Sequence, residues 1–136
     1  MLKTTSQLKK LISTNKKIVI TTHRGPDGDA IGSSLGLFHL LKQLGHKINI
    51  ITPNEYPHFL HWMPANEEIL TYEGNEESAD VITAQADLIF MLDFSDLSRI
   101  EPFSHTVSKS NATKIMIDHH QDPDKDIADI IFSDTT

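Results

Sequence analysis

Residues with metal-binding side chains gather at three places in the sequence, each directly after a short run of apolar residues. The three groups are His23, Asp27 and Asp29; Asp93; and Asp118, His119 and His120. Carboxylate and imidazole ligands without thiolate suit Mn²⁺, with Mg²⁺, Co²⁺ and Zn²⁺ as alternatives. Carboxylates packed together repel one another, and divalent cations remove that repulsion. The number of ligands predicts a site for two cations and therefore metal-assisted chemistry.

Each group also has a purely structural interpretation. Residues 26–28, Pro-Asp-Gly, are typical of a turn, and Asp29 would suit the N-cap of a following helix. Asp93 could be an ordinary loop residue, and the triplet at 118–120 could be a hydrogen-bonded polar strand end. These interpretations do not explain why all three groups follow strands, so we interpret the groups as parts of one site.

The pattern of apolar residues predicts alternating strands and helices. Short β-branched or apolar runs predict strands at 17–22, 47–52, 87–92, 114–117 and 127–132. Helical spacing predicts helices at about 5–13, 31–44, 76–85, 97–100 and 105–110. This order indicates βαβ units, so we expect an α/β fold with a parallel β-sheet flanked by helices. Because the carboxyl ends of parallel strands share one edge, the three groups should meet in one crevice.

The composition limits the classes of function. The 136 residues suit one domain, and 12 basic against 19 acidic residues give a formal charge of −7. An acidic chain is a poor general binder of nucleic acid, so a phosphorylated substrate would need bound cations to offset the repulsion. The chain has no cysteine, which excludes disulfides, zinc–thiolate sites and cysteine nucleophiles.

No signal peptide or membrane-spanning run is present in the sequence, so we expect a cytoplasmic protein without a membrane partner. Five further histidines do not follow strands in this way. We predict that they are surface or packing residues: His39, His46, His58, His61 and His105.

Three ordered motifs resemble those of the DHH family of phosphoesterases, hydrolases that cut phosphate esters with two divalent cations. Residues 22–33, Thr-His-Arg-Gly-Pro-Asp-Gly-Asp-Ala-Ile-Gly-Ser, are similar to the first motif. Leu92-Asp93 with Ser98-Arg99 resembles the second, and Asp118-His119-His120 is the triplet that names the family. The resemblance covers nearly all of residues 1–136 and implies the catalytic domain of such an enzyme.

The resemblance implies a role for each candidate residue. His23 and Asp27 would hold one metal ion, Asp29 and His119 the other, and Asp93 would bridge both. Asp118 would support the ligands, and His120 would lie near the substrate phosphate, so that these two complete the catalytic set. A hydroxide shared by two cations about 3.5–4 Å apart would attack phosphorus. Gly32 and Ser33, near the start of the following helix, and Arg99 would be weaker phosphate contacts.

Two family features are missing from this sequence. The family has a fourth motif, an Asp in a Thr-Asp-Thr-Gly-like segment, after a further helix. Asp134 superficially resembles it but follows His120 too closely, so we interpret residues 133–136 as a loop leading toward that helix. The smaller C-terminal substrate-binding domain is also absent. We therefore expect the chain to continue in the natural protein, and residues 1–136 alone to be incomplete for activity.

The first motif is most similar to the branch of oligoribonucleases and 3′-phosphoadenosine 5′-phosphate phosphatases. Short RNA or DNA oligonucleotides, or a phosphorylated nucleotide, are therefore the expected substrates. A family II inorganic pyrophosphatase and a non-catalytic nucleotide- or metal-binding module remain alternatives. The sequence leaves the oligomeric state open, with a homodimer among the alternatives.

Overall fold

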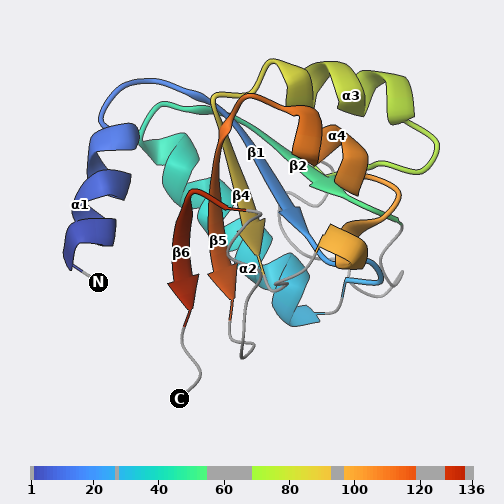
Figure 1. The fold of residues 1–136 in the computed structure, drawn as a ribbon, viewed down its shortest axis with the longest axis horizontal. Coiled ribbons are helices and arrows are strands. Elements are labelled where there is room, and N and C mark those ends of the chain that lie inside the picture. Colours follow the sequence, from blue (N-terminus) through green and yellow to red (C-terminus); the bar gives the residue numbers. More distant parts are fainter. Residues whose placement is uncertain (1, 27, 55–68, 93–96, 119–127, 134–136) are drawn as a thin grey trace.

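A single sheet of six parallel strands forms the centre of the molecule (Figure 1). The computed structural model describes residues 2–26, 28–54, 69–92, 97–118 and 128–133. The strand order is β3-β2-β1-β4-β5-β6, and every neighbouring pair is parallel. The strands are β1 (Lys17–Thr22), β2 (Lys47–Thr52), β3 (Ile69–Thr71), β4 (Leu88–Leu92), β5 (Thr113–Asp118) and β6 (Ile130–Ser133).

Helices cover both faces of this sheet (Figure 1). They are α1 (Leu2–Leu11), α2 (Gly28–Gln43), α3 (Glu76–Ala84), the 3₁₀ helix η3 (Leu97–Ile100) and α4 (Ser104–Lys109). One apolar core includes Ile18 and Ile20 with residues of α1 and α2. A second core includes Val19 with residues of α3, η3 and α4. Both faces of β1 are therefore buried, which explains its uninterrupted apolar run from Ile18 to Ile20.

The prediction of a parallel α/β fold is confirmed, and most element boundaries agree closely. The strands predicted at 17–22 and 47–52 have these bounds, whereas β6 begins three residues later than predicted, at Ile130. The first helix begins at Leu2, not near residue 5. The sequence did not predict β3, because three half-buried residues are too short to show an alternating pattern.

Two aspartates fix the level at which neighbouring strands begin. Asp87 lies directly before β4, and its Oδ2 accepts a hydrogen bond of 2.8 Å from the Lys17 amide of β1. Asp129 lies before β6 and accepts in the same way from the Lys114 amide of β5, also at 2.8 Å. The amides of both aspartates donate in return to the carbonyls of these lysines. Each aspartate therefore closes the end of a strand pair and opposes a slip in register.

A buried hydrogen bond joins β1 to β4 at the opposite edge. Thr22 pairs with Leu92, and the Thr22 hydroxyl donates to the Leu92 carbonyl at 2.8 Å. Leu92 pairs in turn with Ile117 of β5. The carboxyl ends of the three strands β1, β4 and β5 are therefore level.

His46 is a packing residue, as predicted. Its ring is buried beside the start of β1, and Nδ1 accepts a hydrogen bond of 3.1 Å from the Lys16 amide. His39 and His105 are exposed, also as predicted, and His58 and His61 lie outside the described residues. Among the residues that the structure describes, no helix is long and apolar enough to cross a membrane.

A small polar network fixes the turn between β3 and α3. The buried Tyr72 hydroxyl donates to the Asp80 carboxylate at 2.9 Å, and the Thr106 hydroxyl of α4 donates to the same oxygen at 2.6 Å. The hydrogen bond with Thr106 acts to lower the pKa of Tyr72. Burial and the Asp80 carboxylate outweigh that effect and raise the pKa above its ordinary value. The network therefore favours the neutral phenol.

Thr22→Val tests the bond between β1 and β4. The substitution keeps the shape of the side chain but leaves the Leu92 carbonyl without its hydroxyl donor, so we expect a loss of about 1 kcal/mol in the free energy of unfolding. Thr22→Ser retains the hydroxyl and serves as the control. Urea unfolding measures both, and equal destabilisation by Val and Ser would show that the bond adds nothing.

Tyr72→Phe tests the network at the β3–α3 turn. Because the pKa of Tyr72 is raised by folding, there is a range of alkaline pH in which the phenol is neutral in the folded protein but ionised in the unfolded chain. This stabilisation is therefore complete below about pH 10 and is lost as the pH rises further. We expect Tyr72→Phe to cost about 1 kcal/mol at pH 7 and to weaken the alkaline loss of stability. Urea unfolding between pH 7 and 11 measures the difference, and parallel curves for the two proteins would contradict the expectation.

Candidate functional site

The predicted site residues fall into three classes in the structure. Described with their side chains are His23, Gly32, Ser33 and Arg99. Asp29 and Asp118 are described by their backbone alone. Outside the described residues are Asp27, Asp93, His119, His120 and Asp134. The structure therefore tests where the chain segments meet, while the ligand geometry stays a prediction.

Three neighbouring strands end together where the predicted ligands begin. Thr22, Leu92 and Ile117 lie side by side at the carboxyl ends of β1, β4 and β5. His23 is the next residue after β1, and Asp118 is the last residue of β5, paired with Ser133 of β6. The prediction that β5 ends before Asp118 is therefore wrong by one residue. Parallel pairing extends to the aspartate because β6 supplies a partner on its outer side.

The described hydrogen bond of His23 suits metal binding through Nε2. Its Nδ1 lies 2.8 Å from the Arg24 carbonyl oxygen. A carbonyl oxygen can only accept, so Nδ1 carries the proton and donates it. In a neutral ring with this hydrogen bond the lone pair is on Nε2, a form in which an imidazole binds a cation while its Nδ1–H group is held by a backbone carbonyl. The half-buried His23 ring therefore fits the predicted role of a metal ligand.

The first turn of α2 corrects two details of the prediction. Asp29 is the second residue of the helix, so the interpretation of Asp29 as the N-cap is wrong. An acidic residue in the first turn of a helix is still favourable, because the amino end of the helix dipole is positive. Gly32 and Ser33 lie beyond the first turn and are exposed. In an α-helix that begins at Gly28, the amides of Gly32 and Ser33 donate to carbonyls of the preceding turn. The amides without a partner inside the helix are those of its first residues, starting with Gly28.

The loop after β1 is held by hydrogen bonds from two sides. On one side, the Arg24 amide donates to the Arg99 carbonyl at 2.6 Å, and the Arg24 guanidinium donates to the Glu101 carbonyl at 2.9 Å. On the other side, the Gly25 amide donates to Oδ1 of Asn54 at 2.7 Å. Sequence reasoning missed Arg24 and Asn54 as contributors to the site. No sequence signal could have found these contacts, because each involves a backbone group whose partner lies far away in the chain.

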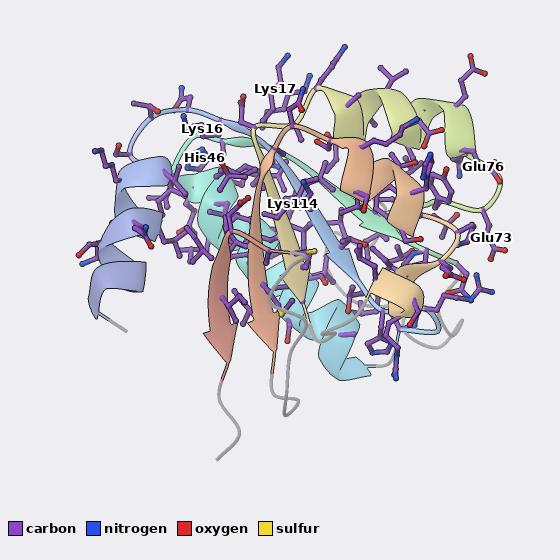
Figure 2. All side chains as sticks on the ribbon, viewed as in Figure 1. Lys16, Lys17, His46, Glu73, Glu76 and Lys114 are labelled. Carbon is purple, nitrogen blue, oxygen red and sulfur yellow. The ribbon has the colours of Figure 1, made fainter. Side chains whose placement is uncertain are left out.

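Positive charge is distributed unevenly between the two edges of the sheet. The lysines with described side chains lie where helices end or strands begin: Lys9, Lys10, Lys16, Lys17, Lys42, Lys47, Lys109 and Lys114. Figure 2 shows Lys16, Lys17 and Lys114 at this amino-end edge. At the carboxyl-end edge, the described basic side chains are those of Arg24 and Arg99. Among its described side chains, the candidate site therefore has little positive charge.

Within the described ranges, no three His, Asp or Glu side chains form a group that could hold a metal ion. Three of the five predicted ligands lie outside those ranges, and the Asp29 side chain is not described. The fit to a metal therefore rests on the His23 tautomer and on the three level strand ends.

Comparison with known proteins gives related sequences and a related structure. The "Bifunctional oligoribonuclease and PAP phosphatase NrnA" of Thermus thermophilus is 51% identical over 51 residues, which cover 38% of this chain and 15% of that protein. A "Probable manganese-dependent inorganic pyrophosphatase" of Streptococcus thermophilus is 28% identical over 109 residues, covering 77% of this chain and 32% of that protein.

The crystal structure of an exopolyphosphatase-related protein from Bacteroides fragilis superposes with a TM-score of 0.96 at 44% identity. It matches 99% of this chain, which covers 39% of that protein. The chain thus spans well under half the length of each of these three relatives.

The sequence profile described as "DHH family, N-terminal domain" matches residues 17–136. This range contains all six strands and each of the three motifs that resembled that family. The chain therefore belongs to the DHH family.

Proposed function

We propose that the protein is a metal-dependent phosphoesterase that hydrolyses phosphate esters of short oligonucleotides, of 3′-phosphoadenosine 5′-phosphate, or of both. The observation that carries this proposal is the common level of Thr22, Leu92 and Ile117. The residues that follow these three positions in the chain include all the predicted metal ligands and His120. Level parallel strands bring such residues to one edge of the sheet, where α/β proteins bind ligands.

The proposed ligand set follows from the family's motifs. His23 and Asp27 would hold one cation, Asp29 and His119 the other, and Asp93 would contact both. Two divalent cations, Mn²⁺ in the first place, would supply an activated nucleophile at neutral pH and stabilise the charge that develops on phosphorus. Asp118 would orient a neighbouring ligand, and His120 would contact the substrate phosphate. The Nδ1–H group of His23, bound to the Arg24 carbonyl, supports the first of these assignments.

The charge of the chain supports a requirement for cations. A formal charge of −7 repels a phosphorylated substrate. Arg24 and Arg99 are the described basic side chains near the site, and the guanidinium of Arg24 is already bound to the Glu101 carbonyl. Arg99 is exposed and is the better candidate for a direct phosphate contact. One arginine cannot offset this much negative charge, whereas two bound cations would do so locally.

The first motif favours oligonucleotides and the bisphosphorylated nucleotide as substrates. It resembles the oligoribonuclease branch of the family, and the related Thermus thermophilus protein is named for both of these activities. Inorganic pyrophosphate is the second candidate, because a longer match joins this chain to a protein named as a manganese-dependent pyrophosphatase.

Neutralising the aspartates at the two ends of β4 tests the proposed metal site. Asp93→Asn, like Asp93→Ala, should lower Mn²⁺-dependent hydrolysis of the dinucleotide pApA by at least about 100-fold, since even outer partners of metal ligands typically contribute about 10–100-fold. Asp87→Asn at the amino end of the strand is the matched control and should retain activity, because the asparagine oxygen can still accept the hydrogen bond from the Lys17 amide. The assay uses the full-length polypeptide with and without chelator. Equal rates for Asp93→Asn and Asp87→Asn would contradict the proposal, and so would wild-type hydrolysis that chelator leaves unchanged. Mn²⁺ binding without hydrolysis would favour a non-catalytic module.

A substrate panel separates the two enzymatic candidates. We expect kcat/KM for pApA or 3′-phosphoadenosine 5′-phosphate to exceed that for pyrophosphate by more than about tenfold, which corresponds to about 1.4 kcal/mol of transition-state stabilisation. The three substrates are compared at one Mn²⁺ concentration and one ionic strength, because electrostatic repulsion differs between them. A preference for pyrophosphate would assign the protein to the second candidate activity.

A further inference from the structure

One peptide group connects Asn54 to the predicted metal ligand His23. The peptide between Arg24 and Gly25 uses its carbonyl oxygen to accept from His23 Nδ1 at 2.8 Å. The amide of the same peptide donates to Oδ1 of Asn54 at 2.7 Å. A peptide group is planar, so its carbonyl and its amide cannot turn independently. When Asn54 fixes the direction of the Gly25 amide, it therefore also fixes the direction of the Arg24 carbonyl oxygen that binds the His23 ring.

We propose that Asn54 is a positioning residue for metal binding, acting on His23 through the Arg24–Gly25 peptide. The proposal rests on the function proposed above, because His23 matters to catalysis only if it binds a cation. Asn54 itself touches neither the reacting groups nor His23 in any described contact. Its proposed effect is to fix the plane of one peptide and thereby the tautomer and direction of the imidazole.

The surroundings of Asn54 are suited to hold a peptide in place. Asn54 lies two residues beyond β2, the strand that pairs with β1, so it reaches the loop from the neighbouring strand end. Pro53, directly before it, is buried, and so is Pro26, directly after Gly25. Each proline fixes one backbone dihedral. Both partners of the 2.7 Å hydrogen bond are thus attached to backbone with little freedom to move.

The loop needs such a support because its own backbone provides little. Gly25 has φ of +61°, a left-handed conformation that a residue with a side chain adopts only at a cost. The Arg24 amide is held by the Arg99 carbonyl, but that bond belongs to the preceding peptide and leaves the Arg24–Gly25 plane able to rotate. The hydrogen bond from Gly25 to Asn54 stops this rotation. Because bonds in a chain polarise one another, it also strengthens the carbonyl as an acceptor for His23.

Asn54→Ala and Asn54→Asp separate the hydrogen bond from the rest of the side chain. Alanine removes the acceptor, while aspartate keeps an oxygen in nearly the same place. Asn75→Ala is the matched control, because the Asn75 side-chain Nδ2 also binds a backbone group: it donates to the Thr71 carbonyl at 2.9 Å, in a turn that carries no predicted ligand. All variants are made in the full-length polypeptide. Thermal unfolding in chelator records any general loss of stability.

Two measurements test the inference. Mn²⁺ titration followed by electron paramagnetic resonance should show a dissociation constant raised by about 10-fold or more in Asn54→Ala, the range found for outer-shell partners of metal-binding histidines, and unchanged in Asn75→Ala. Nitrogen-15 NMR of the imidazole in chelator should show that His23 keeps the Nδ1–H tautomer in wild type and in Asn54→Asp. In Asn54→Ala it should become a mixture of tautomers.

The outcomes distinguish this inference from the proposed function. Metal affinity that is unchanged in Asn54→Ala, or that falls equally in Asn75→Ala, overturns the inference while the phosphoesterase proposal stands. A wild-type protein that binds no Mn²⁺ and hydrolyses no substrate overturns both. If Asn54→Ala does not fold, the Asp variant decides: a mixture of His23 tautomers in that variant, despite the retained acceptor, also overturns it.

Discussion

The register of the parallel sheet is the constraint on which the candidate site depends. Parallel strands expose their last residues on one edge, but those residues meet only if the strands also end level. The carboxylates of Asp87 and Asp129 bind amides near the starts of neighbouring strands, those of Lys17 and Lys114, and align these strand ends. At the other end, the Thr22 hydroxyl binds the Leu92 carbonyl. The site is therefore specified by polar contacts at both ends of strands whose interiors are apolar.

Much of this architecture could be predicted because burial on both faces leaves a strong trace in the sequence. A run such as Ile18-Val19-Ile20 predicts a central strand without further information. The same reasoning failed for β3, a three-residue strand at the edge of the sheet, where burial is only partial. It also missed Asn54, since its partner is a backbone amide 29 positions earlier in the chain. Residue type indicates which side chains could bind a metal, whereas the contacts that orient them depend on the folded chain.

The described lysines gather at the edge of the sheet where the strands begin. Lysines occupy the ends of helices and the starts of strands, where they also complement the negative ends of the helix dipoles. Glu76 and Glu77 lie in the first turn of α3, where they complement the positive end of that helix dipole. This arrangement stabilises the helices and leaves little positive charge among the described side chains at the carboxyl-end edge.

The left-handed turn at Gly25, between the Arg24 anchor and the buried Pro26, has an entropic consequence. A loop that is ordered by hydrogen bonds to neighbouring segments loses its conformational freedom when the chain folds, and a cation that binds later does not have to order it. The loss of freedom on ligation is then small, so that a few ligands suffice for a given affinity. If the site binds cations as proposed, rigidity in residues 23–26 would reduce the number of coordinating groups that the site needs.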